Sequence, residues 1–372
     1  MRVTQNMMIN NMIYWTSKQT EKLSKVQTEV ASGKQINQPS DDPAGMGRVL
    51  TDRSTISAYG QHESNISQAL TWIEVSETTL DAVDTLLQDA QNIVVNLASS
   101  DLDSRENAFM QLESIYEQVI GYANTQFGST FLYSGNQSGS IPFSDEVSIS
   151  GGTVSDIVFA LAGDASDVSI EITDSEGEVI RTIAVSGGGA EGTNTIAWDG
   201  CDDDGNPLSD GDYDFSVTAS DSAGETVAAY TAYRGDSGDK EVIIGEGRTI
   251  TLNNDGGSLF SNILNVLSQA ITALEASDYD TDVMSQLGTV LGEESDRIAT
   301  ERVALANITS HLETNADRLE KLAMVVEERI SETEAGSTEE AVIKLQAQET
   351  AYEVTLEATA SVLKMSKLSD YI

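Results

Sequence analysis

The segment Ala31-Ser-Gly-Lys-Gln-Ile-Asn-Gln-Pro-Ser-Asp-Asp-Pro-Ala-Gly45 combines the signals that end one helix and begin another. Gly33 can take the left-handed backbone of a helix C-cap without strain, so it predicts the end of the first helix. Pro39 holds the residues around it extended. An N-cap oxygen for the second helix can come from Ser40, Asp41 or Asp42. Pro43 then suits the first position of that helix. We therefore predict two helices joined by a short, well-specified connection.

Charge and composition exclude several classes of protein. The chain has 372 residues and a net charge of −41, from 61 acidic and 20 basic side chains. This charge argues against nucleic acid and anionic membrane surfaces as partners. No stretch approaches the roughly 20 apolar residues of a membrane span, and the N-terminus lacks the apolar segment of a secretory signal. Cys201 is the only cysteine, so we expect no disulfide within the chain.

Glycine and proline divide the chain into two helical flanks and a β centre. Residues 128–257 hold 21 of the 29 glycines, and no proline follows Pro43 in either flank. Long helices are therefore possible only in the flanks. The predicted fold class is α+β: a long antiparallel helical bundle or coiled coil built from both termini, with an inserted all-β domain.

Two flanking segments carry apolar residues at every seventh position, which predicts buried helical seams. The seam positions are Ile66, Ile73, Leu80, Leu87 and Val94, then Leu291, Ile298, Leu305, Leu312, Leu319 and Val326. The helix predicted over 4–32 has a sparser seam. It consists of Ile9, Met12, Leu23, Val26 and Val30. Such a helix is marginal alone, so we predict that it packs on another helix or another subunit.

The C-terminal flank contains a second break. Gly336 and a capping box formed by Ser337 and Glu340 predict a stop and a restart, with a last helix over about 338–368. This break mirrors the one at Gly33, so the two terminal helices are natural partners. The predicted domains are terminal helices (1–40 and 337–372), a helical bundle (41–135 and 258–336) and a β insert (136–257).

The β centre has short strands of alternating pattern separated by turn signals. Examples are residues 168–172, 179–183 and 213–217, with a hairpin turn at 174–177 between the first two. The predicted core is aromatic and aliphatic, consisting of Trp198, Tyr213, Phe215 and Val217. The ends of the insert are rich in Ser and Gly, so we expect few contacts to cross them.

The connection at 31–45 resembles the motif that closes the first helix of bacterial flagellar axial proteins. Flagellins carry an alanine–lysine version, whereas the form bracketed by Pro39 and Pro43 is more similar to the hook-associated protein 3 (FlgL) family. Residues 124–143 and 230–260 resemble the exit from the helices and the return to them in that family. The C-terminal Leu363-Lys-Met-Ser-Lys-Leu-Ser-Asp-Tyr-Ile372 resembles the family's terminus.

The β block over 192–215 is similar to the immunoglobulin-like sandwich of the flagellar hook-capping protein. Members of the hook-associated protein 3 family often have a smaller central domain, so this insert departs from the usual pattern of that family. This difference leaves the role of the outer surface open, but it does not affect the axial role that the resemblance implies for the helices.

The resemblance implies a structural subunit, not an enzyme, at the hook–filament junction of the extracellular flagellum. Implied partners are hook-associated protein 1, flagellin, further copies in a ring, an export chaperone and the flagellar type III export apparatus. No cofactor or metal is implied. The assembly motif comprises Gly33, Pro39, Ser40, Asp41, Asp42 and Pro43. The terminal assembly helices contribute Ile9, Met12, Leu23, Val26, Val30, Leu363, Leu368, Tyr371 and Ile372.

Two alternatives remain at this stage. The chain could be a flagellin, or it could be a secreted adhesin or glycan-binding protein acting through the β insert. Catalytic residues are scarce, since His62 and His311 are the only histidines. Residues 202–204 are three consecutive aspartates that fail the EF-hand pattern but leave another cation site open. The tripeptide Arg234-Gly-Asp236 is expected to be a turn.

Overall fold

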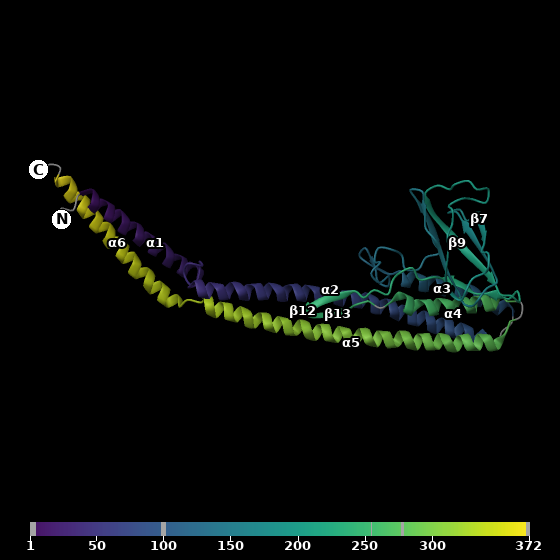
Figure 1. The fold of residues 1–372 in the computed structure, drawn as a ribbon. Helices are drawn as coiled ribbons and strands as arrows, with labels where there is room; N and C mark the ends of the chain where they lie inside the picture. Colours follow the sequence, from purple (N-terminus) through teal and green to yellow (C-terminus); the bar gives the residue numbers. More distant parts are fainter. Residues whose placement is uncertain (1–4, 98–101, 254, 277–278, 370–372) are drawn as a thin grey trace. The chain divides into compact units, whose positions relative to one another are not determined.

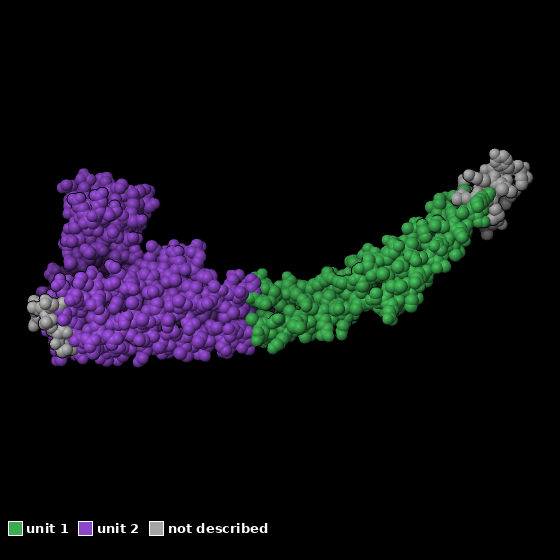
Figure 2. Space-filling model, turned by 180° about the vertical axis from the view of Figure 1, so that it is seen from behind, with its two compact units in different colours: residues 1–63, 316–372 green, residues 64–315 purple. Residues whose placement is uncertain are grey.

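The computed structural model describes residues 5–97, 102–253, 255–276 and 279–369 (Figure 1). Its contacts divide the chain into two compact units, residues 1–63 with 316–372 (unit 1) and residues 64–315 (unit 2), as Figure 2 shows. The helices are α1 (Gln5–Ser32), α2 (Pro43–Leu97), α3 (Leu102–Ala123), α4 (Gly256–Glu275), α5 (Thr281–Glu334) and α6 (Thr338–Ser369). The predicted helical flanks and β centre are therefore confirmed.

The heptad seams form the core of the long helices. Every seam position from Ile66 to Val94 in α2 and from Leu291 to Val326 in α5 is buried. Polar side chains also link these helices: Ser295 Oγ donates to Asp84 Oδ1 at 2.5 Å, and Arg302 lies 2.7 Å from Asp81. Directional bonds of this kind favour one register of α2 against α5, which apolar seams alone specify less strictly.

Helix α4 was not distinguished from α5 by the sequence pattern. Its start is capped by Asp255, whose side chain accepts a hydrogen bond from Gly257 N. Apolar residues are buried along most of its length, namely Leu259, Phe260, Ile263, Leu264, Val266, Leu267, Ala270 and Leu274. Phe260, Leu267 and Leu274 recur at every seventh position, so α4 lies within the helical flank predicted from residue 258, and only its separation from α5 was not predicted.

The insert is a β-sandwich. One sheet has the strand order β4-β3-β9-β6-β7 with β10 beside β9, and the other has the order β11-β5-β8. These strands are β3 (Glu146–Ser150), β4 (Thr153–Val154), β5 (Ile157–Leu161), β6 (Asp167–Thr173), β7 (Val179–Ala184), β8 (Gly192–Ile196), β9 (Gly211–Ser220), β10 (Thr226–Val227) and β11 (Ala229–Thr231). The β6–β7 hairpin turns at Gly177, which has φ +82°. The predicted strands and this hairpin are confirmed.

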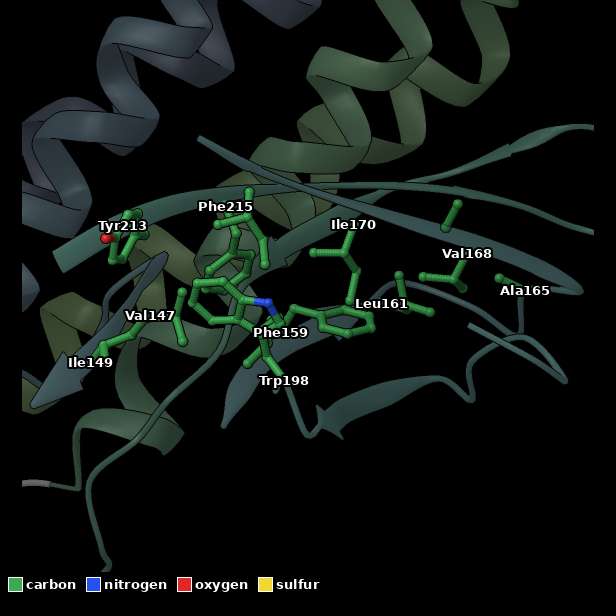
Figure 3. Packing of buried hydrophobic residues seen from close by; sticks show 13 residues of the cluster. Val147, Ile149, Phe159, Leu161, Ala165, Val168, Ile170, Trp198, Tyr213 and Phe215 are labelled. Atoms are coloured by element: carbon green, nitrogen blue, oxygen red, sulfur yellow. The ribbon is translucent and has the colours of Figure 1, made fainter. Parts of the chain in front are cut away.

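The two sheets enclose the aromatic core that the sequence predicted (Figure 3). Trp198 and Tyr213 meet edge to face with ring centroids 5.7 Å apart, and Phe215 is also buried. Val217 is only partly buried at the edge of this cluster. The Tyr213 hydroxyl donates to Ser209 O at 2.8 Å, so the buried ring keeps its polar end satisfied.

Two small β-ribbons complete the central region. β1 (Gln126–Phe127) pairs with β2 (Thr130–Phe131), and β12 (Glu241–Gly245) pairs with β13 (Arg248–Thr251). The second ribbon is attached to the long helices rather than to the sandwich. Asn65 of α2 donates to Ile243 O and Asn315 of α5 donates to Ile244 O, each at 2.8 Å.

The ends of the insert are richer in contacts than their composition predicted. Phe143 and Tyr233 form an antiparallel bridge, so the chain leaves and re-enters the helical part at adjacent points. Tyr116 of α3 and Ser268 of α4 both form hydrogen bonds to β11. The expectation that few contacts cross the boundary was therefore wrong, because buried side chains of the helices reach the returning strand.

Candidate assembly site

The connection between α1 and α2 has most of the local geometry that its sequence predicts. Gly33 has φ +68°, and its N–H donates to Glu29 O at 3.0 Å to close α1. Pro43 is the first residue of α2. Asp42 Oδ1 accepts from Ala44 N at 3.0 Å, which makes Asp42 the N-cap.

Asp41 and Ser40 do not cap α2. The Asp41 side chain turns back and accepts from Asn37 N at 3.1 Å and from Gln38 N at 3.0 Å, so it organises the connection itself. Lys25 Nζ of α1 lies 2.8 Å from its other oxygen. The hydrogen bond from Lys25, together with the backbone bonds, holds the pKa of Asp41 below its ordinary value. Ser40 and Pro39 are exposed at the turn.

The connection is packed as well as hydrogen-bonded. Ile36 is buried although its neighbours in sequence are exposed. It lies against Gly45 in the first turn of α2, where an added Cβ would be 2.6 Å from Ile36 Cδ1. Glycine at position 45 is therefore required by close approach, and substitution would push Ile36 out of its place.

The break at Gly336 lies directly against the break at Gly33. Lys34 and Ala335 form an antiparallel bridge, and Gln35 N donates to Glu334 O at 2.8 Å. The α6 start is capped by Ser337, whose hydroxyl accepts from Glu340 N at 3.2 Å. Two interruptions about 300 residues apart in sequence thus form one structural feature, which we call the double break (residues 33–42 and 334–337).

Buried carboxylates hold the double break together. The Glu334 side chain is 4% exposed and is paired with Lys34 Nζ and with Arg53, the latter at 2.6 Å. Asp52 is also buried and receives a two-pronged contact from Arg329, with Nε 2.8 Å from Oδ2. Sequence reasoning missed the Arg53–Glu334 and Arg329–Asp52 pairs. Their separations of 277 to 281 residues leave no local pattern, although basic residues are scarce in the chain.

The terminal helices α1 and α6 lie side by side (Figure 1). The predicted seam residues of α1 face this contact but are only half-buried: Ile9, Met12, Leu23, Val26 and Val30. The seam is partly polar, since Gln348 of α6 donates to Gln19 of α1. The predicted residues Leu363, Leu368, Tyr371 and Ile372 lie outside the residues whose side chains the structure describes.

Large apolar side chains lie on the outer faces of unit 1. On α1 these are Met7, Met8, Ile13, Tyr14 and Trp15, and on α6 they are Val342, Ile343, Val354 and Leu356. Trp15 is 60% exposed and Ile343 is 66% exposed, whereas no α1 seam residue is fully buried. The pair thus exposes several bulky apolar side chains, while the α1 side of its shared seam is only half-buried. Exposed apolar side chains of this size, when they gather on one face, are typical of surfaces that contact other proteins.

Charge is distributed unequally between the units. Unit 1 has 18 acidic and 13 basic residues, and unit 2 has 43 acidic and 7 basic residues. Unit 2 therefore carries −36 of the net charge of −41. The apolar outer faces belong to the nearly neutral unit, where like-charge repulsion between copies is weakest.

The other sequence candidates have structural explanations. Asp202 is bonded by Asn206, which lowers its pKa, and Asp203 lies 3.9 Å from Arg181. No group of acidic, histidine or cysteine side chains that could hold a metal occurs among the described residues. Asp236 Oδ1 accepts from Asn136 N and Gly238 N, so the Arg-Gly-Asp tripeptide is a bonded turn. Within the described ranges, no helix is long and apolar enough to cross a membrane.

Comparisons with known proteins fit both parts of this architecture. Residues 3–138 match the bacterial flagellin N-terminal helical region, and residues 144–223 match the FlgD Ig-like domain. The chain is 27% identical over 146 residues to flagellar hook-associated protein 3 of Escherichia coli K12, covering 38% of this chain and 46% of that protein. It is 26% identical over 147 residues to the Salmonella typhimurium LT2 protein of the same name, again covering 38% and 46%. The chain thus spans about half the length of these curated relatives.

A similar fold occurs in a solved structure from Vibrio parahaemolyticus whose description names a flagellar hook-associated protein. The TM-score is 0.53 at 16% identity, covering 79% of this chain and all of that one. The class that these matches indicate is a flagellin-like protein with an inserted Ig-like domain, to which the chain is similar in residues 3–138 and 144–223. Within that class, the chain is similar to hook-associated protein 3, and we describe it as FlgL-like.

Proposed function

We propose that this chain is a structural subunit of the bacterial flagellum, located at the hook–filament junction outside the cell. Copies would form a ring between hook-associated protein 1 and the first flagellins. The export chaperone and the flagellar type III export apparatus would be earlier partners. The relatives named hook-associated protein 3 support this assignment, and so does the motif bracketed by Pro39 and Pro43.

One observation carries the proposal: unit 1 exposes bulky apolar side chains on α1 and α6 while their shared seam is partly polar. Such a surface gains free energy when it is covered, about 25 cal/mol for each Å² of apolar area removed from water. Because α1 and α6 also pack on each other, the natural occupants are the corresponding helices of neighbouring subunits. The predicted seam residues and the double break would then orient this surface for assembly.

The double break would serve as a fixed joint in the assembled subunit. Gly33 and Gly336 end the terminal helices, and the buried Glu334 and Asp52 link the N- and C-terminal chains across the break. A joint held by charge-assisted bonds resists deformation better than two unlinked loops. The domain boundaries predicted at 40/41 and 336/337 remain our proposal for where the assembly part begins.

Flagellin is the second candidate function. The Borreliella burgdorferi flagellar filament 41 kDa core protein is 31% identical over 91 residues, which cover 24% of this chain. Both candidates place unit 1 in a flagellar assembly, so a strain test separates them. The gene is deleted in its own host, and the cells and culture medium are examined for filaments. A junction role predicts that intact flagellin is exported and shed. If the chain is instead a flagellin, filaments built from any other flagellin gene should stay attached to the cells, and no flagellin should be shed into the medium.

A further inference from the structure

The Ig-like insert is fastened to the helical part by a chain of three polar side chains, of which Thr231 is buried and Tyr116 and Asp145 are half-buried. Thr231 Oγ1 in β11 is 2.6 Å from Asp145 Oδ2, at the start of the insert. The same hydroxyl is 3.1 Å from the hydroxyl of Tyr116 in α3. Thr231 N donates to that tyrosine oxygen at 2.8 Å. We call these three residues the polar anchor.

The direction of each hydrogen bond follows from the donors available. A threonine hydroxyl has one proton, and the ionised Asp145 carboxylate can only accept, so Thr231 donates to Asp145. Tyr116 must then donate its proton to Thr231 Oγ1 while its own oxygen accepts the Thr231 N–H. All three groups are satisfied in this arrangement, and loss of Tyr116 would leave the Thr231 N–H without its partner.

The anchor is largely shielded from water, with Thr231 buried and Tyr116 and Asp145 half-buried. Burial raises the pKa of Asp145, and it also raises the pKa of Tyr116. The charged groups that act on Asp145 are Arg234, which favours its ionised form, and Asp214 and Glu146, which oppose it. A fourth bond, from Ser268 Oγ of α4 to Ala229 O at 2.6 Å, joins β11 to a second helix. An unpaired polar group at such a site costs more than the bond itself contributes.

We propose that the polar anchor holds the insert in one orientation on α3 and α4, so that the insert is a fixed arm and not a module on a flexible tether. The two chain crossings at Phe143 and Tyr233 lie side by side and would by themselves act as a hinge. The anchor adds contacts from two helices on the returning strand. Tyr116 belongs to α3, outside the sandwich, so its removal tests docking without altering the core of the insert.

The test measures the distance between spin labels in the full chain by pulsed electron resonance. Labels are placed at the exposed positions Ser175→Cys, in the β6–β7 turn, and Glu117→Cys, in α3, with Cys201→Ser to remove the native thiol. The parent should give one narrow distance distribution. Tyr116→Phe should raise the population of undocked inserts about tenfold or more, because Thr231 N–H and Oγ1 each lose a partner.

Tyr122→Phe is the matched control, since Tyr122 lies on the same helix and is exposed. It should reproduce the parent distribution. Asp145→Asn should also remain narrow because an amide oxygen still accepts from Thr231, whereas Asp145→Ala should broaden it. A broad parent distribution would overturn the proposal. So would Tyr116→Phe and Asp145→Ala distributions indistinguishable from that of the parent.

Discussion

Replacing Glu334 with glutamine should loosen the double break. The substitution keeps the size and an acceptor oxygen but removes the charge that faces Lys34 and Arg53. Each partner uses a different carboxylate oxygen, so glutamine keeps an acceptor for one of them and turns its NH2 group toward the other. A hydrogen bond to a charged group contributes about 1.5–3 kcal/mol. Lys34 and Arg53 are 45% and 54% exposed, and solvent screening reduces the effect. We expect a total loss of about 1–2 kcal/mol.

Hydrogen exchange at the Gln35 amide measures the loss of stability at the double break, because the Gln35 N–H donates to Glu334 O. A change of about 1.4 kcal/mol in the free energy of local opening corresponds to about tenfold faster exchange. Glu332→Gln is the control, because Glu332 is exposed on the same helix. Equal exchange at Gln35 in the Glu334→Gln variant and in the parent would refute the idea that charge holds the break closed.

Three further outcomes are expected. Leu305→Asp should lower the melting temperature strongly, because it places a carboxylate in a seam position that is 2% exposed, whereas Val303→Asp at an exposed position should not; equal melting temperatures would refute burial of the seam. Asp145→Asn should stabilise the protein relative to the parent at neutral pH. Burial raises the pKa of Asp145 in the folded state, so ionised Asp145 destabilises the protein at pH values above that pKa. The stability gained by Asp145→Asn should therefore shrink as the pH falls toward 3.8. A stability difference that does not change with pH would contradict the burial of Asp145. Limited proteolysis of dilute monomer should digest α1 and α6 before α2–α5, since the α1 seam is only half-buried; equal rates would refute this.

Periodic and capping signals made the helices predictable from the sequence. The unbroken heptads from Ile66 and from Leu291 anticipated buried seams, and Gly33 and Pro43 anticipated a helix end and a helix start within about one residue. Residues 258–336 were predicted to be helical, but the break between α4 and α5 was not, because neither glycine nor proline marks it. Asp41 was misassigned as a cap because its side chain bonds the connection that precedes it.

Long-range polar pairs were beyond sequence reasoning for a different reason. Glu334 and Asp52 look like ordinary helical surface residues, and only the antiparallel arrangement brings Arg53 and Arg329 to them. The polar anchor is similar, because Tyr116, Asp145 and Thr231 come from three separate elements. No local rule distinguishes a buried hydroxyl that joins two domains from one that faces water.

The central claim is that the outer apolar face of unit 1 joins this subunit to its neighbours. Ile13 in α1 and Val303 in α5 are each 62% exposed, so aspartate at either position should leave the monomer folded. Each variant is returned to the deletion strain, and attached filaments and shed flagellin are counted. We expect Ile13→Asp to be exported but to shed flagellin, and Val303→Asp to keep its filaments attached. Equal attachment with the two variants would contradict it.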